Sequence, residues 1–272
     1  MQDFIEDLKA SVQPDVVAEL LQEYGAETLR YKILTIRLLS TTTKTERDKT
    51  TANAVMFLSP ATETSKQTLC PWSTQACREA CLIYSGRLRT RLVRHARMFR
   101  TMLFLSQPDL FQTRLIDEIT KHEAKAIHQG KIPVVRFNGT TDLQEHRVFR
   151  NIPQVSLFSK IPRMFPRVQF VEYTKNPKQD PRAQNQVLTL SYSGSNQAHA
   201  IQHLSQGRNV AVVFDGPLPE TWLGYPVVSG DTHDNRFKDP QTGVIVGLQL
   251  KGTSRAKDQA RLGKFAVAVN TS

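Results

Sequence analysis

The stretch KIPVVRFNGTTD, residues 131–142, contains the two signals that decide the predicted fold. Its first half is a nearly continuous apolar run rich in β-branched residues, which is typical of a strand buried on both faces of a parallel sheet. Its second half is a polar turn, and side chains that follow such strands line the cleft of parallel α/β proteins. The stretch therefore predicts an α/β fold whose functional edge lies at the carboxyl ends of the strands.

The same pattern recurs along the chain and gives about eight candidate strands, the number in a (β/α)₈ barrel. These apolar runs are residues 52–60, 131–139, 167–176, 186–194, 208–216, 225–230, 243–252 and 264–269. Helical segments between them are predicted at 88–105, 108–129 and 195–206. The leading prediction is a partial (β/α)₈ TIM-barrel-like fold in which several crossovers of the second half are shortened to loops. A doubly wound open sheet is the alternative, although no GxGxxG or Walker-type loop follows any strand.

The N-terminal region has a different character from the rest of the chain. Residues 1–33 read as short amphipathic helices, with Pro14 at a helix start and Gly25 at its end. The segment STTTKTERDKTTAN, residues 40–53, is almost free of apolar side chains and reads as a connector. The sequence therefore predicts a helical appendage and connector over 1–50 and an α/β domain over 51–272.

Composition places the chain among ordinary globular proteins that carry excess positive charge. Hydrophobic residues make up 39% and charged residues 22% of the 272 positions, and no apolar run is long enough to span a membrane. The N-terminus, MQDFIEDLKA, does not resemble a signal peptide, so a cytoplasmic protein is expected. The formal net charge of +11 favours anionic partners such as nucleic acid or phosphorylated metabolites, although charge alone is weak evidence for either.

All three cysteines of the chain fall within LCPWSTQACREACLIYSG, residues 69–86. Cys70, Cys77 and Cys81 have the spacing C-x6-C-x3-C and follow the first predicted strand, and a helix over ACREACLI would place Cys77 and Cys81 on one face. Structural zinc needs four protein ligands, and no second CxxC or nearby HxxxH supplies the fourth. Three thiolates suit a [4Fe–4S] cluster that keeps one iron open. Zinc, or three buried thiols that bind nothing, are the alternatives.

Polar side chains at the other predicted strand ends are candidates for the chemistry of the cleft. The densest group is SGDTHDNRFKDP, residues 229–240, in which a carboxylate beside a histidine could move a proton or ligate a metal. A salt-bridged turn, with Arg236 paired to Asp231 or Asp234, is the alternative for this segment. The predicted catalytic residues are Asp142, Asp231, His233 and Asp234. The predicted cofactor-binding residues are Asn138, Lys175, Ser191, Arg236 and Lys251.

The segment from Gly86 to Leu105 is predicted to form an arginine-rich helix. Its apolar side chains fall opposite its arginines, which predicts a helix packed on the core with a basic outer surface. That surface could bind nucleic acid, although a solvated charged face is the more common reason for such a pattern. His95 falls on the apolar side and is expected to be a buried core histidine. The arginines are Arg87, Arg89, Arg91, Arg94, Arg97 and Arg100.

The cysteine stretch, the run RHARMFRT at 94–101 and the late segment VVSGDTHDNRFKDPQTGVIVGLQLKGTSR together resemble the phage-encoded "gene product eighty-eight" type of protein. The similarity covers roughly residues 50 to 256. It implies a viral protein that works in the host cytoplasm and has an iron–sulfur centre. A weaker resemblance is to radical S-adenosylmethionine enzymes, which also use three cysteines after the first barrel strand. Their C-x3-C-x2-C spacing differs from the spacing here.

The sequence therefore predicts a [4Fe–4S] protein that performs redox or Lewis-acid chemistry on a small anionic substrate. The alternative is a nucleic-acid-binding phage protein whose metal site is structural and whose arginine-rich helix contacts the nucleic acid.

Overall fold

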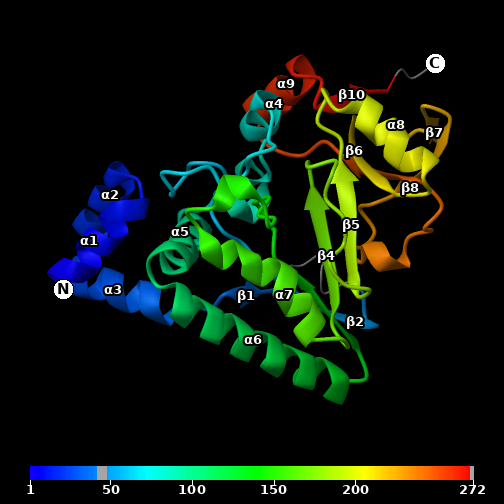
Figure 1. Cartoon of the computed structure of the whole chain (residues 1–272). Helices are drawn as coiled ribbons and strands as arrows, with labels where there is room; N and C mark the ends of the chain where they lie inside the picture. Colours follow the sequence, from blue (N-terminus) through cyan, green and yellow to red (C-terminus); the bar gives the residue numbers. More distant parts are fainter. Residues whose placement is uncertain (42–47, 270–272) are drawn as a thin grey trace.

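The computed structural model describes residues 1–41 and 48–269, in which helices pack around one mixed sheet (Figure 1). The strands are β1 (Leu39–Ser40), β2 (Thr51–Met56), β3 (Ile132–Arg136), β4 (Gln169–Thr174), β5 (Gln186–Ser191), β6 (Val210–Asp215), β7 (Thr221–Trp222), β8 (Tyr225–Ser229), β9 (Ile245–Gln249) and β10 (Ala266–Ala268). The α-helices are α1 (Gln2–Ser11), α2 (Pro14–Tyr24), α3 (Ala26–Thr35), α4 (Gln75–Glu79), α5 (Arg91–Ser106), α6 (Pro108–His128), α7 (Leu157–Met164), α8 (Gln197–Ser205) and α9 (Ser254–Leu262).

The sheet is mainly parallel, as the apolar runs predict. Its strand order is β1-β2-β3-β4-β5-β6-β9-β8-β7, with β10 paired to β6 beyond the end of β5. Every neighbour from β2 to β8 is parallel, whereas β1 and β7 pair antiparallel at the two ends. Each of the eight predicted runs contains one of these strands, so the α/β class is confirmed.

The sheet does not close into the expected barrel. In the described part of the chain, β1 and β7 have no strand on their outer sides. The order also departs from a (β/α)₈ barrel, because β9 lies between β6 and β8 instead of following β8. The short 3₁₀ helix Arg236–Lys238 packs against β4 and β5, and Asn235 beside it bonds to the start of β2. The segment between β8 and β9 thus packs on the central strands of the sheet.

The helical layer packs on the sheet through a core that is rich in phenylalanine. Phe137 and Phe170 from the sheet contact each other with ring centroids 5.3 Å apart, and Phe158 of α7 lies 5.2 Å from Phe137. Phe104 of α5 stacks on Phe158 at 5.9 Å. Offset and edge contacts of this kind stabilise packed aromatic side chains beyond the area that they bury.

The N-terminal helices belong to the same core. Leu8, Leu20, Leu29 and Ile33 are fully buried, and they cluster with the apolar face of α5. These helices are therefore packed on the body of the protein. The predicted connector, 40–53, lies partly outside the described residues. None of the helices that the structure describes has the length and apolar character needed to cross a membrane.

Candidate functional site at the carboxyl edge of the sheet

Three of the predicted site residues meet where β3, β4 and β5 end. The Oδ2 atom of Asp142 accepts a 2.8 Å hydrogen bond from the backbone amide of Lys175. The Nζ atom of Lys175 in turn donates a 2.9 Å bond to Oγ of Ser191. Since all three follow or end neighbouring parallel strands, their positions follow from the sheet itself.

Asn138 organises the turn that carries Asp142. Its Oδ1 accepts bonds from the Leu143 amide at 2.9 Å and from Thr141 Oγ1 at 3.0 Å, and its Nδ2 donates to the Leu143 carbonyl at 3.1 Å. The same Nδ2 also donates to the carboxyl group of Glu172. Asn138 is therefore a structural hub of this edge, with its polar atoms committed to the protein.

Glu172 and Asp142 form a pair of buried carboxyl groups. Glu172 is 1% exposed, and burial raises its pKa to about 7, although hydrogen bonds from Gln186 and Asn138 oppose the shift. The charge of Asp142 also raises the pKa of Glu172, and burial raises the pKa of Asp142 itself. Glu172, whose environment disfavours ionisation, can therefore hold and transfer a proton near neutral pH.

The cysteine loop is fastened to this edge at several points. The amide of Asp142 donates a 3.1 Å bond to the Leu69 carbonyl, next to Cys70. The sulfur of Cys70 accepts a 3.3 Å bond from the Ala61 amide and lies 3.8 Å from the Thr140 carbonyl. Figure 1 shows α4 of this loop beside α9, at the end of the molecule toward which β4 and β5 point. The predicted position of the cysteines, past the carboxyl end of β2, is therefore confirmed.

The three thiols do not form a ready-made metal site. Each cysteine is free and half-buried, and within residues 1–41 and 48–269 no three His, Cys, Asp or Glu side chains are arranged to hold a metal ion. Burial raises the pKa of Cys70 to about 12 and that of Cys81 to about 11, and the charge of Cys77 adds to both shifts. The sulfurs are thus within electrostatic range of one another without ligand geometry, and a metal would have to draw them together.

The late segment 229–240 divides between two places. Asp231 forms an ion pair with Lys251 and accepts a 2.9 Å bond from the Gln249 amide, which places this pair at the ends of β8 and β9. His233 and Arg236 lie further on, where Arg236 donates to the His233 carbonyl. Asp234 contributes its backbone carbonyl to the Arg236 amide at 3.1 Å. No described contact joins these residues to Asp142.

The predicted salt bridge of Arg236 exists, but with a different carboxylate. Arg236 is 1% exposed, and its guanidinium lies 3.2 Å from Asp239 instead of Asp231 or Asp234. The 3₁₀ turn over Arg236–Lys238 explains the choice, since it brings residues three apart onto one side. A buried arginine that is paired within its own turn stabilises that turn. Fewer of its hydrogen-bond donors are then available to bind a cofactor.

The arginine-rich helix does not present the basic surface that was expected. Arg94 pairs with Glu19 at 2.7 Å, Arg91 pairs with Glu23, and Arg97 is buried with Glu63 at 3.0 Å. The glutamates of α2, which sequence proximity could not indicate, neutralise much of this face. Arg87 and Arg89 remain exposed in the short turn before α5.

The expectation for His95 is confirmed. The ring is 2% exposed, and its Nδ1 lies 2.8 Å from the Tyr24 hydroxyl.

Sequence reasoning missed Glu172 and the contact of Asn235 with β2. Glu172 lies within the apolar run RVQFVEYTKN, and a single carboxylate in a strand buried on both faces was the signal that could have revealed it. Asn235 donates 2.7 Å and 2.9 Å bonds to Asp48 and Thr51, and no local sequence pattern indicates a contact over that distance along the chain.

Comparison with known proteins gives one finding. The model of the Gene product 88 family matches residues 34–264, which include strands β1 to β9 and the cysteine loop. No curated protein and no solved structure matches the chain.

Proposed function

We propose that this chain, which belongs to the Gene product 88 family of phage proteins, is a metalloenzyme whose centre is assembled at the carboxyl edge of the sheet. Cys70, Cys77 and Cys81 would hold a [4Fe–4S] cluster, with zinc as the alternative. The substrate would be a small anion, and the site of action the host cytoplasm. The observation that carries the proposal is the 3.1 Å bond between the Asp142 amide and the Leu69 carbonyl, which joins the cysteine loop to the buried acid pair.

The donor set fits soft metal chemistry better than any other kind of site. Thiolates select iron–sulfur clusters and zinc, and a site of this type commonly forms only when the metal binds. Burial raises the pKa of Cys70 and Cys81, so both thiols are protonated in the metal-free protein and a metal would have to displace these protons.

The protein groups around the centre can accept and donate protons and can bind an anion. A cluster held by these cysteines would supply Lewis-acid or redox chemistry. Asp142 and Glu172 are both buried, and their charges repel each other when both are ionised. One of them can therefore keep a proton near neutral pH. Lys175, half-buried and bonded to Ser191, provides positive charge beside Asp142 for an anionic substrate.

The test is the metal and acid-labile sulfide content of the protein purified without oxygen, together with its absorption spectrum. About four iron and four sulfide per chain with a thiolate-to-iron band are expected for the wild type. The variant Cys77→Ser should lose them, whereas Gln75→Ala, an exposed change in the same helix, should not. An intact metal content in Cys77→Ser, with a native circular dichroism spectrum, would refute the thiolate centre.

A further inference from the structure

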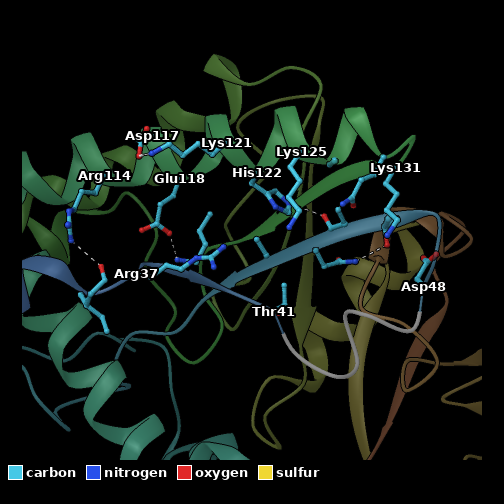
Figure 2. A pocket seen from close by; sticks show the side chains of 18 of the residues that line it. Arg37, Thr41, Asp48, Arg114, Asp117, Glu118, Lys121, His122, Lys125 and Lys131 are labelled. Atoms are coloured by element: carbon cyan, nitrogen blue, oxygen red, sulfur yellow. Dashed lines mark hydrogen bonds and ion pairs between the residues drawn. The ribbon is translucent and has the colours of Figure 1, made fainter. Parts of the chain in front are cut away.

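A pocket lies at the opposite end of β2 from the cysteine loop. This pocket has a volume of about 720 Å³ and is lined by α6, the residues around β1, the first residues of β2, and Lys131 just before β3 (Figure 2). It shares no lining residue with the carboxyl edge described above. The proposed metal site and this pocket are thus separate features of the molecule.

Positive charge dominates the pocket wall. Six lysine and arginine residues line it against three carboxylates. The carboxylates are already engaged: Glu118 accepts 2.8 Å bonds from the amides of Leu38 and Leu39, Asp117 pairs with Lys121 at 2.6 Å, and Asp48 pairs with Lys238. The lining cations are Arg37, Lys49, Arg114, Lys121, Lys125 and Lys131.

Three of these cations have no acidic partner in the described part of the chain. The side chains of Arg37, Lys125 and Lys131 make no ion pair there, unlike Lys121 with Asp117. Figure 2 shows Lys125 on α6 and Lys131 before β3 extending toward the space over β2. Arg37 lies near Glu118, toward the other end of the pocket (Figure 2). Charges of one sign that converge on a concave surface attract anions more strongly than the same charges spread over a convex surface.

The environment of His122 is further evidence that these cations converge on the pocket. Its Nε2 lies 3.0 Å from the Ala52 carbonyl at the pocket floor. Burial is the main reason that its pKa is lowered, and the charges of Arg37 and Lys125 lower it further, against the opposing effect of two backbone carbonyls. Cations from α6 and from the segment before β1 therefore act on the same point of the pocket.

The shape of the pocket suits a ligand with more than one phosphate group. Arg114 and Lys125 lie eleven positions apart on α6, which corresponds to about 16 Å at 1.5 Å per residue. Apolar residues, among them Leu39, Ala54 and Ala126, form part of the lining, and none of the described lining residues is Phe, Tyr or Trp. The ring of His122 also lines the pocket, but it is held at the Ala52 carbonyl, so recognition would rest mainly on the phosphates.

We propose that this pocket binds phosphate groups through Arg37, Lys125 and Lys131. The phosphates could belong to a small phosphorylated molecule or to a nucleic-acid strand, which present the same chemistry. Arginine and lysine are the residues that bind phosphate most effectively, by bidentate hydrogen bonds and by point charge respectively.

The experiment measures binding of two probes, inorganic pyrophosphate and a fluorescent single-stranded oligothymidylate, to the full chain at low salt. The test variant is the double substitution Arg37→Ala with Lys125→Ala. The control is Arg87→Ala with Arg89→Ala, which removes the same charge from exposed positions outside the pocket. Neither pair removes a described side-chain hydrogen bond, and the carbonyl of Arg37 that accepts from Arg100 is kept.

We expect the pocket variant to bind at least about tenfold more weakly than wild type, since one lost charge-assisted contact is worth about that factor. The control should stay within about twofold, because its arginines lie outside the pocket. Pyrophosphate binding identifies a small phosphorylated ligand, whereas binding of the oligonucleotide alone, with a strong salt dependence, identifies a nucleic-acid strand. Equal weakening of both variants, or no binding of either probe by wild type at millimolar concentration, overturns the proposal.

Discussion

The side-chain amide of Gln186 donates a 2.9 Å hydrogen bond to the carboxyl group of Glu172 across neighbouring strands β5 and β4. Asn138 donates to the same carboxyl group from the turn after β3. A buried acid that lies inside the sheet thereby links three consecutive strands. Ionisation of Glu172 would place a buried charge among these strands.

Stability should therefore depend on the ionisation of Glu172. Its pKa is about 7 in the folded protein against an ordinary value of 4.5, so the folded state holds the proton more tightly. The resulting stabilisation is fully present below about pH 4.5 and is lost as pH rises through 7. The charge of Asp142 raises the pKa of Glu172, and the charge of Arg136 lowers it.

Glu172→Gln should remove this pH dependence, because glutamine resembles the protonated acid. Between pH 5 and pH 8, the free energy of unfolding of wild type should fall by up to about 3 kcal/mol relative to the variant. Urea unfolding at both pH values measures this difference, in which titrating groups that do not interact with Glu172 cancel. The exposed substitution Glu220→Gln is the control. Parallel curves for wild type and Glu172→Gln would show that Glu172 does not titrate in this range.

Gly263 should be intolerant of a side chain because it packs on the cysteine loop. A Cβ atom at this position would lie 2.1 Å from the Cβ of Ala76 in α4. Gly263→Ala should destabilise the protein by about 1–3 kcal/mol, as overpacked contacts do. Adding Ala76→Gly should restore part of the loss in thermal unfolding by removing the clash. A double variant that is less stable than Gly263→Ala alone would contradict the packing shown here.

The buried ion pair of Arg97 with Glu63 should matter more than the exposed pair of Arg94 with Glu19. Arg97 is 1% exposed, and Glu63 is its only carboxylate within ion-pair distance in the described chain. Glu63→Gln leaves that charge buried without a counterion, which typically costs about 3 kcal/mol. Glu19→Gln should cost less than about 1 kcal/mol, because both partners are partly exposed. Equal costs in chemical unfolding would mean that water reaches Arg97.

Asn235 should hold the late segment to the start of β2. Asn235→Ala removes both of its bonds, to Asp48 and to Thr51, and should cost about 1–3 kcal/mol of unfolding free energy. Asn235→Asp should cost more, because it places a carboxylate against Asp48. Thr232→Ala, an exposed change in the same segment, is the matched control. A wild-type midpoint for both Asn235 variants would show that this contact contributes nothing to stability.

The sequence predicts the central strands well, because strands buried on both faces give long apolar runs such as that of residues 131–139. It fails where pairing depends on distant segments. The insertion of β9 between β6 and β8 leaves no mark on either run, since both read as buried strands. The two-residue strands β1 and β7 are too short for any periodicity.

The candidate site shows the same division. Asn138, Asp142, Lys175 and Ser191 are predictable because parallel strands end together. Glu172 was missed because a polar residue inside an apolar run was assigned no role. The arginines of α5 were assigned to the surface because their partners, Glu19 and Glu23, belong to a helix some seventy residues earlier.

The bond between Asn235 and Asp48 joins residues 187 positions apart, and this has a consequence for how the chain is made. During synthesis, β2 to β6 leave the ribosome long before the segment that packs against β4 and β5. That face of the nascent sheet stays uncovered until the late segment has been synthesised, because a contact of this sequence separation cannot form early. A chain stopped before residue 235 would expose that face and should be a preferred target of chaperones and proteases.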